Sequence, residues 1–317
     1  MASTRLFFAT DLHGSEKCYL KFVNAGKFYK ANILIMGGDV TGKLLIPVIK
    51  EPNGNYYATF LESRHTARGE KELQDLLRDI RFSGYYPYIT DSEQLHRMQT
   101  DEAKVHEVFV KAMIDVFRNW IHLAEERLKG TGIKIYITGG NDDLPELKDV
   151  LHESDYVIDP EDRVVTLDDN HEMISEGWSN PTPWKTPREC SEDELWTKIE
   201  KMTSQVVDMK KCVFNLHVPP IDSGLDTCPK LDANLKPVIV AGEMEMMAGG
   251  STAVRKAVET CQPLLGLHGH IHEAKGFVKI GPTLCLNPGS EYGEGILRGA
   301  LLTLENGSVK NFLLTQG

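Results

Sequence analysis

The chain has 317 residues, 41% of them hydrophobic and 26% charged, and its formal net charge at pH 7 is −11. This length suits one large domain with a substantial core or two small domains. The acidic balance argues against a nucleic-acid binder that works through a broadly basic surface, but not against a phosphorylated substrate, because bound cations reverse the potential inside a local cleft.

No targeting segment is evident in the sequence. The apolar run at 6–9 is too short for the core of a signal peptide and is closely followed by Asp11. No other apolar stretch reaches membrane-spanning length. The six cysteines form no C-x-x-C pair, which is typical of a reduced, intracellular protein. We therefore expect a soluble, cytoplasmic protein without a membrane partner.

Short apolar runs alternate with amphipathic helices along most of the chain. The runs predict buried strands at 6–9, 33–36, 133–137, 212–216 and 264–267. Unbroken hydrophobicity of this kind suits strands that are covered on both faces, as in layered α/β proteins.

Helices are predicted near 70–80 and, from a longer periodic pattern, at about 101–129. Ser191 and Glu194 form a capping box that begins a third helix. The segment at about 50–101 shows no strand pattern, and we interpret it as an insertion whose role as a lid, a dimer contact or plain packing is open.

The last part of the chain is richer in strands. Runs at 278–280, 284–286 and 299–304 are strand-like, and Asn306-Gly307 predicts a hairpin turn before the run at 309–314. Together with the earlier pattern, this indicates a single domain over 1–317 in which two sheets pack together with helices outside.

Each of the five predicted strands of the α/β part is followed by metal-binding residue types, namely Asp11 and His13, Asp39, Asn141, His217, and His270 with His272. The carboxyl ends of strands are where ligand sites form in open α/β sheets. Residues two apart in extended backbone point to the same side, so we expect Asp11 with His13, and His270 with His272, each to face one site. The glycines at 37–38, at 139–140 and at 269 permit sharp turns and close approach of the backbone.

Carboxylate, amide and imidazole ligands in one set suit Mn²⁺, Fe or Zn²⁺ rather than a cysteine-based structural zinc. Seven such side chains are too many for one four-coordinate ion. They suit two ions if one carboxylate bridges them, and Asp39 is the candidate bridge. Lys43 and His268 also lie near these positions, but an exposed lysine and a packed strand histidine are the simpler interpretations.

Five sequence blocks resemble the calcineurin-like metallophosphoesterase superfamily in residues and in order, from Asp11 to His272. They are Asp11-Leu12-His13, Gly38-Asp39, Gly140-Asn141-Asp142-Asp143, His217-Val218-Pro219 and Gly269-His270-Ile271-His272. The sequence Asn287-Pro288-Gly289-Ser290 is similar to that of smaller bacterial and archaeal members. The resemblance implies a four-layer double β-sandwich flanked by α-helices.

The resemblance also implies the ligands of two divalent metal ions, with Mn²⁺ the first choice and Fe, Zn²⁺ or Ni²⁺ the alternatives. One ion would be held by Asp11, His13, Asp39 and His272. The other would be held by Asp39, Asn141, His217 and His270. Asn141 and His217 are also expected to contact the substrate, and Asn141 to take part in catalysis.

One position departs from the family pattern. Family members usually have a histidine after the asparagine ligand, and it contacts the phosphate or protonates the leaving group. This chain has Asp142 there, and an ionised carboxylate repels an anionic phosphate. A catalytic role for Asp142 and a solvated loop acid are both open.

The resulting hypothesis is a phosphoesterase that attacks a small phosphorylated substrate with a hydroxide bridging the two ions. A phosphodiester fits better than a phosphomonoester because of Asp142. A nuclease and a non-catalytic, metal-binding scaffold are the alternatives, and self-association is open. The loop-like segment at 219–237 follows His217 directly, and we expect it to overhang the site and influence substrate choice.

Overall fold

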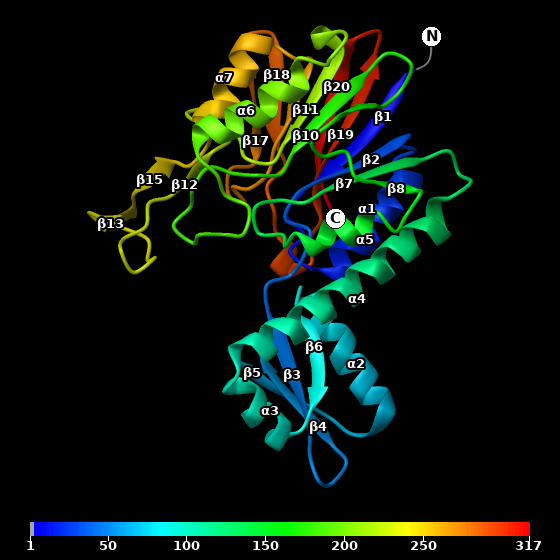
Figure 1. Cartoon of the computed structure of the whole chain (residues 1–317), viewed down its shortest axis with the longest axis vertical. Coiled ribbons are helices and arrows are strands. Elements are labelled where there is room, and N and C mark those ends of the chain that lie inside the picture. Colours follow the sequence, from blue (N-terminus) through cyan, green and yellow to red (C-terminus); the bar gives the residue numbers. More distant parts are fainter. Residues whose placement is uncertain (1–2) are drawn as a thin grey trace.

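The computed structural model describes residues 3–317, apart from the side chain of Gln99. Two six-stranded sheets form its body (Figure 1). The first has the order β20-β19-β1-β2-β7-β8. Its strands are β1 (Thr4–Ala9), β2 (Ile33–Gly37), β7 (Lys134–Thr138), β8 (Val157–Ile158), β19 (Arg298–Glu305) and β20 (Ser308–Gln316).

The second sheet has the order β17-β18-β16-β11-β10-β9. Its strands are β9 (Val164–Thr166), β10 (Glu172–Glu176), β11 (Cys212–Leu216), β16 (Leu265–Leu267), β17 (Gly276–Ile280) and β18 (Thr283–Asn287). Each sheet contains a run of parallel strands, β1-β2-β7-β8 in the first and β18-β16-β11-β10 in the second. The carboxyl ends of the strands within each run therefore share one edge of their sheet.

The alternation of side chains along each strand builds the layers. In β1, Leu6 and Phe8 enter a core between the sheets, whereas Phe7 and Ala9 pack on the opposite face against helices. Helices α1 (Glu16–Phe28), α4 (Glu102–Leu128) and α5 (Glu146–Leu151) cover the first sheet. Helices α6 (Glu192–Thr203) and α7 (Thr252–Cys261) cover the second. The predicted four-layer fold, two sheets with helices outside, is confirmed.

Two local predictions, a helix start and a hairpin turn, are also confirmed. The capping box of Ser191 and Glu194 begins α6, with both reciprocal hydrogen bonds present. Asn306 and Gly307 have φ angles of 52° and 71° and join β19 to β20, as a tight hairpin turn requires.

The segment at 50–101 has more regular structure than its sequence pattern indicates. With the preceding β3 (Leu45–Lys50), it forms a sheet of order β5-β4-β3-β6 from β4 (Tyr56–Phe60), β5 (Ser63–Ala67) and β6 (Tyr86–Thr90). Helix α2 (Gly69–Phe82) packs on this sheet, and α3 (Ser92–Gln99) follows β6. The sequence does not reveal these strands because they bury only alternate residues, such as Ala58 and Phe60 in β4.

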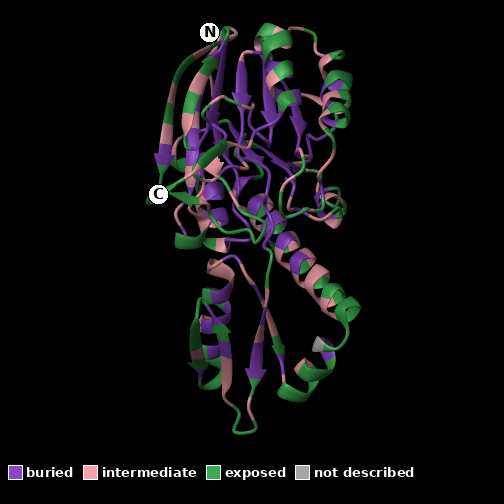
Figure 2. Ribbon diagram, turned by 90° about the vertical axis from the view of Figure 1, so that its left-hand side faces the viewer, coloured by how far each residue is buried: buried purple, intermediate pink, exposed green. Residues whose placement is uncertain are grey.

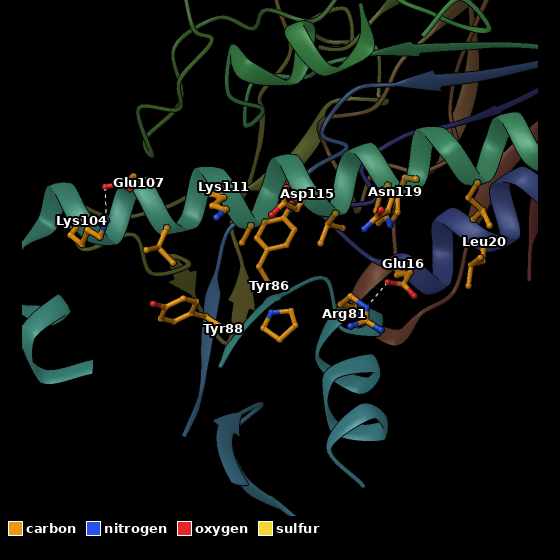
Figure 3. A pocket seen from close by; sticks show the side chains of 16 residues that line it. Glu16, Leu20, Arg81, Tyr86, Tyr88, Lys104, Glu107, Lys111, Asp115 and Asn119 are labelled. Atoms are coloured by element: carbon orange, nitrogen blue, oxygen red, sulfur yellow. Dashed lines mark hydrogen bonds and ion pairs between the residues drawn. The ribbon is translucent and has the colours of Figure 1, made fainter. Parts of the chain in front are cut away.

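This small α/β unit projects from the body, and α4 joins the two (Figures 1 and 2). Phe109, near the start of α4, contacts Tyr86 of β6, while Trp120 lies in the core of the body. A groove of about 770 Å³ runs below α4 between the unit and α1, bordered by Tyr86, Tyr88 and the Glu16–Arg81 ion pair (Figure 3).

A second projection is an arm of short strands, at the left of the body in Figure 1: β12 (Thr227–Pro229), β13 (Ile239–Val240), β14 (Glu243–Met244) and β15 (Met246–Ala248). The 3₁₀ turns η1 (Met209–Lys211) and η2 (Tyr292–Glu294) complete the elements. Within residues 3–317, no helix combines the length and the apolar character needed to cross a bilayer.

Two tryptophans provide a test of this packing. Trp120 is 4% exposed and stacks on Tyr19 of α1 at 4.3 Å between ring centroids, whereas Trp184 is 61% exposed. We expect Trp120→Ala to lower the free energy of unfolding by about 3–5 kcal/mol, because it empties a core site. Trp184→Ala should change it by less than about 0.5 kcal/mol. Chemical denaturation of both variants checks this, and similar losses would contradict the placement of α4.

Candidate metal centre

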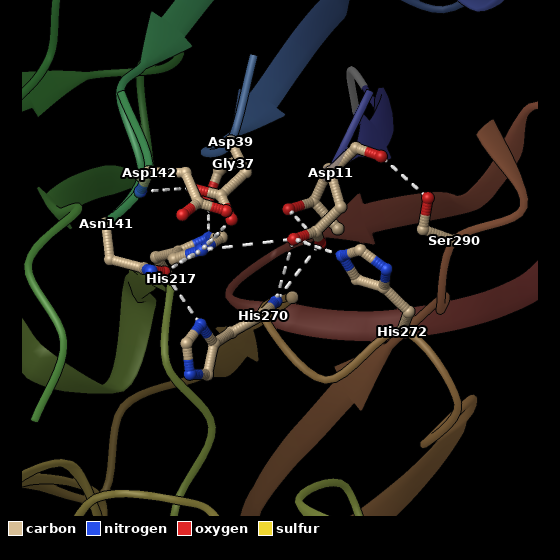
Figure 4. A network of polar contacts seen from close by, with 12 residues as sticks. Asp11, Gly37, Asp39, Asn141, Asp142, His217, His270, His272 and Ser290 are labelled. Carbon is tan, nitrogen blue, oxygen red and sulfur yellow. Dashed lines mark hydrogen bonds and ion pairs between the residues drawn. The ribbon is translucent and has the colours of Figure 1, made fainter. Parts of the chain in front are cut away.

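The seven predicted ligands lie together where strands of both sheets end (Figure 4). Asp11 and His13 follow β1, Asp39 follows β2 and Asn141 follows β7 in the first sheet; His217 follows β11, and His270 and His272 follow β16 in the second. Asp11, His13 and His272 present ligand atoms within 4.8 Å of one another, and Asp39, His217 and His270 do the same.

In the first of these groups, the two histidines meet directly. Nε2 of His13 lies 3.0 Å from Nε2 of His272, and the same His272 atom lies 3.4 Å from a carboxylate oxygen of Asp11. Nε2 of His13 is also 3.7 Å from Asp39. Asp39 therefore borders the first group as well as belonging to the second.

In the second group, the candidate ligand atoms surround the amide oxygen of Asn141. Nε2 of His217 and Nδ1 of His270 lie 3.1 Å and 2.7 Å from this oxygen. His217 Nε2 is also 3.4 Å from Asp39. Asn141 thus completes a set of one carboxylate, one amide oxygen and two imidazoles.

The chemistry of these donors fits divalent metal ions. The backbone carbonyl of Gly37 lies 2.9 Å from Nδ1 of His217 and accepts a hydrogen bond from it, which directs the other ring nitrogen, Nε2, into the cluster. Metal-binding histidines are commonly oriented by such a bond. Mixed oxygen and imidazole donors suit Mn²⁺, Fe or Zn²⁺.

Burial and mutual charge set the protonation of the cluster. Burial alone would raise the pKa of Asp11, but its hydrogen bond with His272 and the charge of His217 lower that pKa to about 2. Burial lowers the pKa of His13 to about 3 and that of His270 to about 4. For His217 burial acts the same way, yet the charge of Asp39 raises its pKa to about 9. Against the effect of burial, the charge of His217 also holds the pKa of Asp39 well below its usual value. Asp11 and Asp39 are thus ionised, as metal binding requires, whereas His217 must lose its proton when a metal ion binds.

The backbone at the candidate ligands is itself unusual. Asp11, His13, Asp39 and His270 have φ angles of 55°, 41°, 48° and 66°, in the left-handed region that costs non-glycine residues energy. Such strain gathers at functional sites because the surrounding structure imposes it. Close packing also excludes side chains nearby: a Cβ on Gly140 would lie 2.2 Å from an Asp39 carboxylate oxygen.

Asp143 holds two of these loops together, a role that the sequence does not reveal. Its buried carboxylate accepts hydrogen bonds from the backbone N–H groups of Val40, Thr41 and Gly140 at 2.7–3.0 Å, and from the Thr41 hydroxyl at 2.6 Å. It therefore joins the loop that carries Asp39 to the loop that carries Asn141. Only its place in the Asn-Asp-Asp block marks it in the sequence.

The Asn287-Pro288-Gly289-Ser290 sequence supports the cluster from the other side. The Asn287 amide donates to the backbone carbonyls of Gly269 and Ile271 at 3.1 Å and 2.9 Å, and the Ser290 hydroxyl donates to the Asp11 carbonyl at 2.6 Å. These bonds fix the turn between His270 and His272 and connect it to the loop of Asp11.

Thr186 fixes the orientation of the Asn141 side chain, which sequence reasoning also missed. The Asn141 amide nitrogen donates to the Thr186 hydroxyl at 2.9 Å, and that hydroxyl donates to Glu189 at 2.7 Å. The amide oxygen is consequently turned toward His217 and His270. Nothing in the spacing of Thr186 from Asn141 indicates this contact in the sequence.

Asp142 lies at the edge of the cluster and forms an ion pair with Lys43. One of its oxygens is 3.8 Å from Nδ1 of His13. Burial, followed by the charge of Asp39, raises the pKa of Asp142 to about 7. The lysine is thus a partner of this acid, whereas His268 is a fully buried residue whose Nδ1 bonds to the Leu216 carbonyl at 2.8 Å.

A cavity of about 790 Å³ adjoins the cluster, and its lining includes Asp39, Asn141, Asp142, His270 and His272. Cys228, Pro229, Leu231, Leu235 and Pro237 also line it. The sequence predicts that the segment at 219–237 overhangs the site, and the second half of this segment does border the cavity.

No model of a known protein family matches the chain. The uncharacterized protein MJ1162 of Methanocaldococcus jannaschii is 29% identical over 158 residues, which are 49% of this chain and 64% of that protein. The chain therefore matches less than two thirds of the length of this curated relative.

Several solved structures share the fold. One crystal structure aligns with 99% of both chains at a TM-score of 0.60 and 15% identity. The protein TT1561 of Thermus thermophilus aligns with 100% of this chain and 99% of its own at a TM-score of 0.53 and 12% identity. The phosphoesterase Yfce of E. coli aligns over 98% of both chains at 11% identity and a TM-score of 0.32.

Two adjacent acids test the role of Asp143. We expect Asp143→Ala to lower the free energy of unfolding by at least about 3 kcal/mol, because it leaves several buried N–H groups without an acceptor. The matched variant Asp142→Ala should change it by less than about 1 kcal/mol, since Asp142 gains from Lys43 but is repelled by Asp39. Chemical denaturation of the metal-stripped proteins measures both, and equal losses would show that Asp143 does not join the loops.

Proposed function

We propose that this chain, which has the fold of the calcineurin-like metallophosphoesterase superfamily, is a metal-dependent phosphoesterase with two divalent cations. The observation that carries the proposal is the convergence of two adjacent groups of ligand-type side chains, one around Asp11 and one around Asp39, beside a cavity that Asp39, His270 and His272 line. Buried carboxylates are costly unless positive charge offsets them, and buried imidazole nitrogens need a hydrogen-bond partner or a bound metal ion.

Under this proposal, Asp11, His13 and His272 hold one ion, and Asn141, His217 and His270 hold the other. Asp39 lies within 3.7 Å of His13 and 3.4 Å of His217, which makes it the carboxylate suited to bridge them. A pair of bound divalent cations supplies Lewis-acid activation of a water molecule and charge stabilisation of a phosphoryl group. Mn²⁺ is the first metal to test.

Other residues of the site contact the phosphate or orient the metal ligands. Lys43 lines the cavity beside Asp142 and offsets its negative charge, so that an anionic phosphate meets less repulsion there. Asn141 and His217 are oriented by Thr186 and by the Gly37 carbonyl, which keeps their ligand atoms directed at the centre. Such preorganised contacts are worth most in transferring phosphoryl groups, where catalysis is largely positioning and electrostatics.

The test is hydrolysis of bis-p-nitrophenyl phosphate and p-nitrophenyl phosphate by metal-stripped protein refilled with Mn²⁺. We expect activity to require the metal and to fall at least about 100-fold in Asp39→Asn and His217→Ala, because even the hydrogen-bond partners of metal ligands are worth 10–100-fold. Metal content, measured on the same samples, should fall below two ions per chain in both variants.

Asp149→Asn is the matched control, since Asp149 is an exposed acid of α5. Its activity and metal content should equal those of the unaltered protein. Two bound ions without cleavage of either ester under any metal would instead favour a metal-binding scaffold. Higher activity on oligonucleotides than on small esters would favour a nuclease.

The position of Asp142 leads to a separate prediction about leaving groups. Asp142→His should raise kcat for phenyl phosphate about tenfold or more, because an imidazole can protonate a poor leaving group without repelling the phosphate. Bis-p-nitrophenyl phosphate, whose leaving group needs no proton, should change little. Asp142→Asn separates the two causes by removing the charge without adding an acid. Equal gains in the His and Asn variants would show that charge alone limits the reaction.

A further inference from the structure

The cavity above the candidate metal centre is much larger than a phosphate group. Its volume of about 790 Å³ lies in the range of about 300–1,000 Å³ that is typical of sites for whole organic ligands. Of the proposed metal-binding side chains, only Asp39, Asn141, His270 and His272 line it, and other residues border the rest. The residues that border the rest of the cavity therefore indicate the chemistry of the non-phosphate part of the substrate.

A tryptophan, Trp184, is among the residues that line the cavity. The indole of Trp184 borders the cavity and is 61% exposed, which is unusual for so large an apolar side chain. Its backbone N–H donates to the Thr182 hydroxyl at 3.2 Å, and that hydroxyl is bonded to Glu189 at 2.5 Å. Trp184 is therefore displayed by a loop that hydrogen bonds hold in place.

The same loop contacts the candidate metal centre. Glu189 also accepts hydrogen bonds from the Thr186 backbone and hydroxyl at 2.8 Å and 2.7 Å, and Thr186 in turn holds the amide of Asn141. Trp184 is only two residues away from Thr186. The loop that carries Trp184 is thus connected by hydrogen bonds to Asn141.

The arm that begins with β12 also borders the cavity. Pro229, Leu231, Leu235 and Pro237 border the cavity, and Leu235 is 45% exposed. This stretch is a closed turn, in which Leu231 pairs with Pro237 and the Asp232 carboxylate accepts the Lys236 N–H at 3.0 Å. Apolar residues of this hydrogen-bonded turn thus border the same cavity as Trp184.

We infer that the alcohol part of the substrate carries a flat aromatic group, which binds in this cavity against Trp184 and the turn at 229–237. The inference rests on the proposed function, because it places the phosphate at the metal centre. An indole offers a planar face for stacking, and the proline and leucine side chains of the turn add apolar contact. Aromatic pairs gain stacking energy beyond the apolar area that they bury, so the affinity for a ligand should rise when it carries an aromatic group.

The experiment compares phosphonates that share one anionic group and differ in the attached group. Methylphosphonate, n-hexylphosphonate and phenylphosphonate are titrated by calorimetry into protein loaded with Mn²⁺. We expect phenylphosphonate to bind about tenfold more tightly than methylphosphonate, which corresponds to about 1.4 kcal/mol, and more tightly than n-hexylphosphonate. In Trp184→Ala and Leu235→Ala the ratio of phenyl to methyl affinity should fall, and in the double variant approach one.

Phe28→Ala is the matched control, because Phe28 is a 75% exposed aromatic residue of α1 that does not border the cavity. It should keep the full ratio. A ratio near one in the unaltered protein, equal binding of the hexyl and phenyl compounds, or a ratio that survives the double variant would each overturn the inference. If methylphosphonate itself fails to bind, the proposed phosphate centre is wrong and the inference falls with it.

Discussion

The burial of two carboxylates at one point is the constraint to which the rest of the site responds. Nε2 of His217 lies 3.9 Å from Asp11 and 3.4 Å from Asp39, and both acids are 1–2% exposed. An ionised carboxylate without a partner costs several kcal/mol when buried. Histidines, backbone N–H groups and, when bound, cations must offset that cost, and every loop of the site is arranged to bring one of them within reach.

That arrangement explains why the local backbone departs from its preferred conformations. Asp11, Asp39 and His270 have positive φ angles, so these loops do not adopt their shape from their own preferences. The hydrogen bonds of Asp143 and Asn287 impose it from outside the cluster. The carboxylate oxygens of Asp11 and Asp39 repel one another and must nevertheless stay close together. The backbone strain at these acids and the hydrogen bonds around them both follow from this requirement.

The sequence predicts the parts of this site that depend on local pattern. Apolar runs that end in Asp, Asn or His indicate the positions that converge, because strand burial and strand-end chemistry both leave a trace in neighbouring residues. The division of these positions between two sheets leaves no such trace. The contacts of Thr186 and Asp143 also leave no pattern in neighbouring residues, because their partners are up to 103 residues away in the sequence. The strands at 56–67 escape prediction because one-sided burial produces too weak an apolar pattern.

The residues proposed for the reaction and those proposed for substrate choice also differ in where they lie in the fold. The proposed metal ligands follow buried parallel strands, which vary little in geometry and tolerate few changes. Trp184 and Leu235 lie in loops beyond those strands, and their side chains contribute little to the core. Substitutions there can change which group the cavity accepts without moving Asp39 or His217. A fold that hosts many activities depends on this separation, because its rigid layers keep the reactive groups in place while its loops select the substrate.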